Sequence, residues 1–213
     1  MQTLTEILVT THPRACITAE DVAHYVPGSD DARFGLVKRA VAAGELLRLR
    51  RGLYCLAPTY RRAPLNLFAL AQYIYGPSYI SLESALSHHG WIPEGVFSVT
   101  SVCTGESKMF RTPVGTFRYS RVPQNILYAA VARESAGDAG DVVLIARPVK
   151  ALADYVYVYR KDWDTSEPVI RSLRIDQEDL AGISLDDIDE AMENYRSKRV
   201  LRFLSGLRKE YAL

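Results

Sequence analysis

The sequence predicts an α+β protein that begins with a small domain of three helices and a hairpin. Three observations support this fold class: three short helix candidates precede a basic hairpin, a β-rich stretch occupies the middle of the chain, and the last part is helical again. We expect a winged helix-turn-helix in residues 1–60 and a mixed α+β domain with a helical C-terminus in residues 64–213. The stretch 58–64, basic and bracketed by two prolines, is the predicted connector.

Helix signals occur three times in the first 44 residues. Apolar residues at helical spacing predict a first helix that starts near Leu4 and ends between residues 10 and 13. Thr18, followed three residues later by Asp21, is a capping-box signal for a second helix. A third helix is predicted over residues 30–43, where Gly44 stops it. This order is typical of the helices of a winged helix-turn-helix.

The third helix has two contrasting faces. Its apolar residues, which we expect to pack on the first two helices, are Phe34, Leu36, Val37, Ala40 and Val41. Its opposite face combines small residues with basic ones: Ala32, Gly35, Lys38, Arg39 and Ala42. Small residues let the backbone approach a surface closely, and an α-helix fits the major groove of DNA.

Positive charge is concentrated in this region. Between Arg33 and Arg62 the chain has eight Arg/Lys residues and one acid, Glu45, although its formal net charge is only +1. Leucines alternate with arginines over residues 46–53, and Arg51-Gly52 marks the predicted hairpin turn. We predict that six basic residues contact double-stranded DNA: Arg33, Lys38, Arg39, Arg48, Arg50 and Arg51. Arginines that are simply solvated, or a winged helix that contacts protein, are the alternatives.

The rest of the chain predicts a mixed domain. Helices are expected over residues 65–75 and 81–89 and from Pro148 onward. Strands are expected at 79–80, 96–103 and 142–146, with a hairpin that turns at 113–115. Residues 176–193 then hold eight acids and no base, whereas residues 196–209 hold six bases and no acid. Both stretches are predicted to be helical, and we expect them to neutralise each other within the chain rather than form a second binding surface.

Composition excludes several other classes. No window approaches the roughly 18 uninterrupted apolar residues that a membrane helix needs, and no signal-peptide pattern is present. Cys16, Cys55 and Cys103 are far apart and form no CxxC pair, which favours reduced, buried thiols over disulfides or a zinc site. We therefore expect a cytoplasmic protein that neither spans nor contacts a membrane.

No catalytic residue, metal ligand or cofactor is predicted. The chain has no GxxxxGK[ST], GxGxxG or HExxH motif. His88 and His89 are adjacent, so their imidazoles would diverge on a helix; they are interpreted as helix-end residues. Asp141 and Lys150 flank an apolar strand, as in some metal-dependent nucleases, but the second acid that such a site needs before the lysine is missing.

Several short segments spread over nearly the whole chain form a further pattern. They are RRGLY at 50–54, SYISLESAL at 78–86, HG at 89–90, IPEGV at 92–96, TSV at 100–102, TPVGTF at 112–117, and PVKAL at 148–152 with Asp154. On these residues the chain resembles the AbiEi family, the antitoxins of AbiE-type, type IV toxin–antitoxin systems.

That resemblance implies a bacterial cytosolic protein with two activities. It would repress its own operon by binding promoter DNA through the N-terminal winged helix, with DNA contact carried onto the same six basic residues. Its C-terminal domain would counteract a nucleotidyltransferase-like toxin without a stable complex, as part of phage defence by abortive infection. Residues 63–213 depart from a strongly basic C-terminal domain, since they hold seventeen basic and nineteen acidic residues.

Two other functions remain open at this point. One is a stand-alone transcriptional regulator whose C-terminal domain senses a ligand or partner. The other, from the enzyme class, is a nuclease or transferase whose site carries no recognisable motif.

Overall fold

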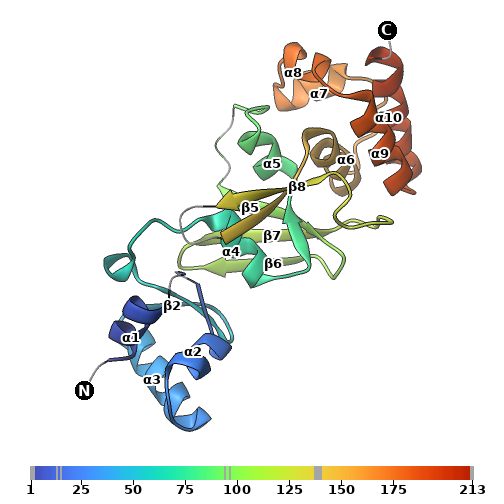
Figure 1. The fold of residues 1–213 in the computed structure, drawn as a ribbon. Helices are drawn as coiled ribbons and strands as arrows, with labels where there is room; N and C mark the ends of the chain where they lie inside the picture. Colours follow the sequence, from blue (N-terminus) through green and yellow to red (C-terminus); the bar gives the residue numbers. More distant parts are fainter. Residues whose placement is uncertain are drawn as a thin grey trace.

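The computed structural model of the chain describes residues 3–12, 14, 16–93, 95, 97–136 and 141–211. The fold is mixed α+β, as predicted, with a three-stranded and a six-stranded sheet. The first three helices lie at one end of the molecule and the last four at the other, with the larger sheet between them (Figure 1).

The N-terminal lobe comprises residues 3–57. Its elements are α1 (Leu4–Thr11), β1 (Cys16–Thr18), α2 (Ala19–Tyr25), α3 (Asp30–Ala42), β2 (Leu46–Arg50) and β3 (Leu53–Leu56). Thr3 and Thr18 each close a capping box at the start of α1 and α2. The three strands form an antiparallel sheet in the order β1-β3-β2. The three predicted helices are confirmed, whereas strand β1 was not predicted.

A hydrophobic cluster of its own holds this lobe together. Its buried members are Leu4, Leu8, Ile17, Val22, Val26, Val37, Ala40, Leu46, Tyr54 and Leu56. They come from all three helices and all three strands, so the helices pack on one face of the small sheet.

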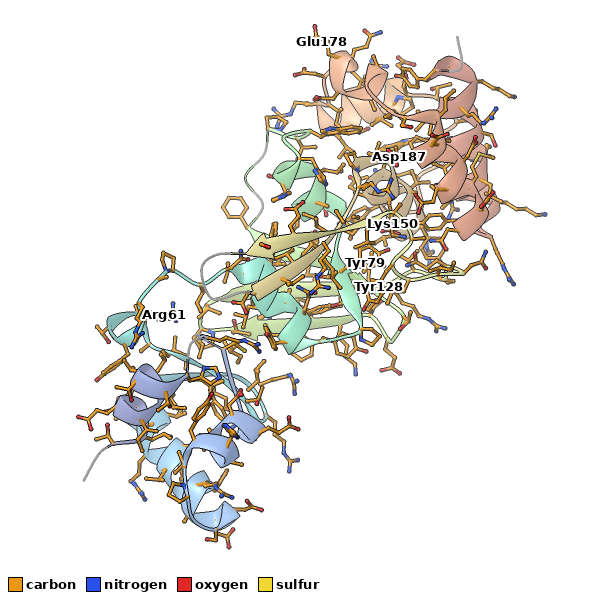
Figure 2. The ribbon with its side chains drawn as sticks, in the orientation of Figure 1. Arg61, Tyr79, Tyr128, Lys150, Glu178 and Asp187 are labelled. Carbon is orange, nitrogen blue, oxygen red and sulfur yellow. The ribbon has the colours of Figure 1, made fainter. Side chains whose placement is uncertain are left out.

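The connector after β3 is bound back onto the N-terminal lobe. A short 3-10 helix, η1 (Pro58–Tyr60), follows the sheet. The Arg61 guanidinium donates through Nε to the Leu56 carbonyl (2.5 Å), and Arg62 donates to the carbonyl of Val9 (2.8 Å). Figure 2 shows Arg61 beside this lobe. The predicted connector is therefore hydrogen-bonded at both of its arginines.

The second lobe comprises the described residues from Leu65 to Tyr211 and contains the larger sheet. Its first elements are α4 (Leu67–Ile74), β4 (Ser78–Ile80), α5 (Leu82–His88), β5 (Ser98–Cys103), β6 (Lys108–Thr112), β7 (Gly115–Arg121), β8 (Val131–Ala136) and β9 (Asp141–Ala146). The strand order is β6-β7-β5-β4-β9-β8. Pairs β5–β7 and β4–β9 are parallel, and the other pairs are antiparallel.

Helices α4 and α5 cover opposite faces of this sheet. The Tyr119 hydroxyl on β7 donates to the Ala71 carbonyl on α4 (2.6 Å). Tyr119 pairs with Ser101 on β5, and the preceding residue of β5, Thr100, points to the other face. Thr100 exchanges hydrogen bonds with Ser84 of α5 (2.8 and 3.0 Å).

The remaining helices form the C-terminal end of the molecule. They are α6 (Pro148–Val158), α7 (Glu167–Leu173), α8 (Gln177–Ala181), α9 (Leu185–Asn194) and α10 (Lys198–Tyr211). The acidic stretch, predicted as one helical segment, is split into α8 and α9, because the chain turns at Gly182 and Ser184 caps a new helix. Helix α7 and edge strand β8 were not predicted.

Both faces of the small sheet are buried. Leu46, Tyr54 and Leu56 point into the core of the N-terminal lobe. Four other side chains join the larger cluster, which is centred on the second lobe: Cys16, Leu49, Leu53 and Cys55. We call the contact that these four residues make the inter-lobe seam. Hydrophobic packing therefore continues across the predicted connector.

Candidate nucleic-acid interface

Local sequence signals define the ends of α3. The hydroxyl of Ser29 accepts from the amide of Ala32 (3.3 Å), which caps the first turn. At the other end Gly44 has a φ of +72°, a left-handed conformation that favours glycine. Both ends of the helix are therefore fixed, and three residues separate its last residue from the first residue of β2.

The small-residue face of α3 lies outward. Ala32, Lys38, Arg39 and Ala42 are exposed, whereas Val37 and Ala40 are buried. A Cβ added to Gly35 would lie 3.6 Å from the Arg39 guanidinium, so this side chain runs back along the helix over Gly35. No other described residue bonds to the Lys38 or Arg39 side chain.

One expected core residue of α3 is on the surface. Phe34 is 66% exposed, which contradicts its predicted place in the apolar face. The neighbouring Arg33 is the less exposed of the two, and its guanidinium bonds to the carbonyl of Val26 at the end of α2. Phe34 therefore adds an aromatic ring to the outer side of α3, one turn before Lys38.

Arg33 is the predicted contact residue that the structure places away from this face. Its Nε donates to the carbonyl of Val26 (2.8 Å), and its guanidinium also pairs with Asp30 (3.0 Å). Its side chain is 23% exposed. These bonds tie the end of α2 to the first turn of α3, so Arg33 fixes the angle between the helices.

The hairpin turns where the sequence predicts. Strand β2 ends at Arg50 and β3 begins at Leu53, and Gly52 has a φ of +73°. Arg48 is paired with Tyr54 and lies two residues after Leu46, so its side chain is on the sheet face that carries α3. Arg48 and Arg51 are exposed, and neither side chain bonds to another residue of the described chain.

Arg50 differs from its neighbours because it contacts the second lobe. A bulge separates it from Arg48 in the pairing with β3. Its guanidinium donates to the carbonyl of Tyr73 on α4 (3.1 Å) and to that of Arg51 (3.2 Å). Arg14, which like Arg50 belongs to the N-terminal lobe, donates to the Tyr73 hydroxyl (3.2 Å). Two predicted contact residues, Arg33 and Arg50, thus have partners within the protein, and the other four have none among the described residues.

The second lobe contains a buried polar network that the sequence did not reveal. Asp154 of α6 is fully buried and accepts from three hydroxyls: Tyr79 (2.8 Å), Ser81 (2.7 Å) and Tyr195 (2.6 Å). One turn earlier on α6, Lys150 donates to Gln124 (2.6 Å). Figure 2 shows Lys150 and Tyr79 within the second lobe. The sequence feature that could have indicated this network is the presence of two charged residues, Lys150 and Asp154, on the apolar face of one predicted helix.

Burial perturbs the charges of this network. Burial raises the pKa of Asp154, and the charge of Lys150 and the hydrogen bonds from the three hydroxyls partly offset this rise. It lowers the pKa of Lys150, an effect that the charges of Asp154 and Glu190 oppose. The Lys150 ammonium also lies 5.0 Å from the Tyr79 ring centre and 5.3 Å from that of Tyr195. The network joins β4, α6 and the α9–α10 junction, which makes it a structural tie within the lobe.

Ion pairs connect part of the acidic and basic stretches. Arg208 of α10 binds Asp189 of α9 through two hydrogen bonds (2.7 and 3.2 Å). Arg199 and Arg202 instead pair with Asp162, before α7 (3.2 and 3.1 Å). The expected neutralisation within the chain is therefore seen for Arg208, while two other bases of α10 use an acid outside the acidic stretch.

A hollow of about 360 Å³ lies on the second lobe. Its lining combines apolar and polar side chains: Asn66, Leu67, Phe68, His88, Glu134, Ser135 and Val143. His88 Nε2 and Glu134 lie 2.9 Å apart at this hollow, and both are half-exposed. His89 instead bonds to the carbonyl of Ala146 (2.9 Å). The two imidazoles thus bind different partners, although their ring centres lie 5.4 Å apart in an edge-to-face arrangement.

The described residues contain no group of three or more His, Cys, Asp or Glu residues placed to hold a metal ion. None of the helices within the described ranges is long and apolar enough to cross a membrane.

Comparisons with known proteins do not identify a family for this chain. No protein-family model matches the chain, and no curated protein matches it significantly.

Proposed function

We propose that the protein binds double-stranded DNA through its N-terminal lobe, which acts as a winged helix-turn-helix. In this proposal α3 enters the major groove, and the β2–β3 hairpin is the wing. The order α1-β1-α2-α3-β2-β3 and the antiparallel β1-β3-β2 sheet support this assignment. The observation that carries it is the set of four exposed basic side chains without a partner in the described chain: Lys38, Arg39, Arg48 and Arg51.

The four residues have different proposed tasks. Lys38 and Arg39 project from the small-residue face of α3, where they reach base edges or phosphates in the major groove. Arg48 and Arg51 lie on the hairpin, where they contact the adjoining phosphates. Arg33 and Arg50 act indirectly: the first fixes α3 against α2, and the second fixes the hairpin against α4.

A charge-reversal experiment tests DNA binding. We expect Arg39→Glu with Arg51→Glu to abolish the gel shift of a DNA fragment from upstream of the protein's own gene. Arg133→Glu with Lys209→Glu is a charge-matched control on exposed positions of the second lobe, and it should bind as the wild type does. Equal binding by both double variants would contradict the proposal.

We further propose that this DNA binding belongs to a cytoplasmic type IV antitoxin that represses its own operon. The support is the resemblance of the segments from RRGLY to PVKAL to the AbiEi family. The second lobe would counteract a nucleotidyltransferase-like toxin without a stable complex. The full-length Arg39→Glu, Arg51→Glu variant should then still rescue growth when that toxin is co-expressed, while failing to repress a promoter reporter.

A second candidate function is a stand-alone regulator that senses a small ligand. The hollow beside His88 and Glu134 favours it, because polar groups converge there on apolar walls. The hollow is lined by the start of α4, the helix that also holds Arg50. A gene neighbourhood without a nucleotidyltransferase, together with ligand-dependent repression, would favour this function over the antitoxin.

A further inference from the structure

Cys16 and Cys55 are direct partners in the small sheet. They occupy opposite positions in the antiparallel pairing of β1 with β3. Directly opposed residues project to the same face of a sheet, and their Cβ atoms lie about 4.5–5.5 Å apart. Both side chains are free thiols, and both belong to the inter-lobe seam.

The hydrogen-bond pattern shows which kind of pair they form. The amide of Ala19 donates to the carbonyl of Gly52 (3.1 Å), which continues the β1–β3 ladder by one residue pair. Hydrogen-bonded and non-hydrogen-bonded pairs alternate along an antiparallel ladder. Cys16 and Cys55 lie three pairs from Ala19 and Gly52, so they form a non-hydrogen-bonded pair. The Cα atoms of such a pair are about 4.5 Å apart, within the range of disulfides.

The surroundings of the two sulfur atoms are unequal. Cys16 is 9% exposed and Cys55 is completely buried. Burial raises the pKa of Cys16 to about 12. Burial also raises the pKa of Cys55, although the Arg61 guanidinium, 3.7 Å from its Sγ, partly offsets that rise. Both groups are therefore protonated at neutral pH, and they react slowly while the seam is closed.

We propose that Cys16 and Cys55 are an oxidative modification site, at which hydrogen peroxide converts the two thiols into a reversible intramolecular disulfide. One sulfur attacks the peroxide O–O bond, which gives a sulfenic acid and one water. The second sulfur displaces the sulfenic oxygen, which leaves as a second water as the S–S bond forms. The two thiols lose two electrons and two protons in total, and the peroxide is reduced to two waters.

The bond would enclose a defined part of the N-terminal lobe. The loop closed between Cys16 and Cys55 contains α2, α3 and β2. A covalent link across such a loop restricts the unfolded chain, so it stabilises the enclosed elements without a change in their contacts. This link would act on the folding of the lobe and is independent of DNA binding.

The test uses full-length protein under native conditions. The purified chain is treated with hydrogen peroxide, remaining thiols are alkylated, and peptides are mapped by mass spectrometry. We expect a Cys16–Cys55 linked peptide, a loss of two hydrogen atoms from the intact mass, and reversal by dithiothreitol. The thermal midpoint of the oxidised protein should exceed that of the reduced protein. Cys16→Ala and Cys55→Ala should each lose the link and the increase, whereas Cys103→Ala, also at a buried thiol, should keep both.

Three results would overturn the proposal. They are native oxidation without the linked peptide, a link that forms only in denaturant, and an oxidised protein no more stable than the reduced one. The peptide map of the wild type decides the first two, whether or not the alanine variants fold.

Discussion

Gly206 of α10 lies directly against the backbone carbonyl of Asp164, so a Cβ at position 206 would overlap that oxygen. The contact brings the loop before α7 onto the helix without an intervening side chain. Because a backbone group cannot rotate aside, any larger residue must displace one of the two segments.

Gly206→Ala should therefore destabilise the protein, although alanine favours helices. We expect a loss of about 3 kcal/mol in the free energy of unfolding, measured by urea denaturation. Gly35→Ala is the matched control, because its Cβ would meet only the flexible end of Arg39. It should be neutral or stabilising by up to about 1 kcal/mol. Equal effects of the two substitutions would show that the Asp164 contact is unimportant.

The buried Lys150 and Asp154 should behave as a coupled pair. Lys150→Met removes the nearest cation from a fully buried carboxylate, so we expect a loss of about 3–5 kcal/mol. Adding Asp154→Asn should recover part of that loss, which a double-mutant cycle measures. Lys161→Met, at a half-buried lysine over two aromatic rings, is the control and should cost much less. Additive effects at Lys150 and Asp154 would exclude coupling.

The Asp189–Arg208 pair should make stability depend on pH in the acid range. The hydrogen bond from Arg208 lowers the pKa of Asp189 below its ordinary value of 3.8. The contribution of this pair to folding stability is therefore complete above pH 3.8. It is lost as the pH falls through the lowered pKa of Asp189 in the folded protein. Asp189→Asn should lower the thermal midpoint at pH 7, and the difference from the wild type should shrink below pH 3.8. Glu193→Gln, an exposed acid of the same helix, should show little difference at either pH.

Arg50 and Arg51 should differ in the salt dependence of DNA binding. Each phosphate contact contributes about one unit to the slope of log affinity against log salt concentration. We expect Arg51→Ala to reduce that slope by about one, while Arg50→Ala leaves it unchanged and lowers stability through the lost bond to Tyr73. Titrations at several salt concentrations compare the two variants, and a reduced slope in Arg50→Ala would assign that residue to the DNA contact.

Features fixed by neighbouring residues could be predicted from the sequence. Thr18 and Ser29 cap helices, and Gly44 and Gly52 adopt left-handed conformations, because each depends on a few adjacent residues. Strands β1 and β8 could not be predicted. The first has three residues, and the second is a weakly apolar edge strand; each is defined by a partner elsewhere in the chain.

In the candidate DNA interface, too, features that depend on neighbouring residues could be predicted, and features that depend on distant residues could not. The outward face of α3 could be read from its small residues, but the orientation of Phe34 could not, because it depends on where Arg33 fits beside α2. The bond between Arg50 and Tyr73 joins positions 23 residues apart in different lobes, so no local pattern indicates it. The network around Asp154 likewise assembles groups from four separate segments.

The inter-lobe seam has a consequence for the way this protein could be engineered or could evolve. If the chain were cut near residue 60 and the N-terminal lobe fused to an unrelated effector, Leu49, Leu53 and Cys55 would face water. An apolar strip on an antiparallel sheet is prone to self-association. The lobe is therefore not a transferable module, and an exchange of its partner would require these seam positions to be redesigned at the same time.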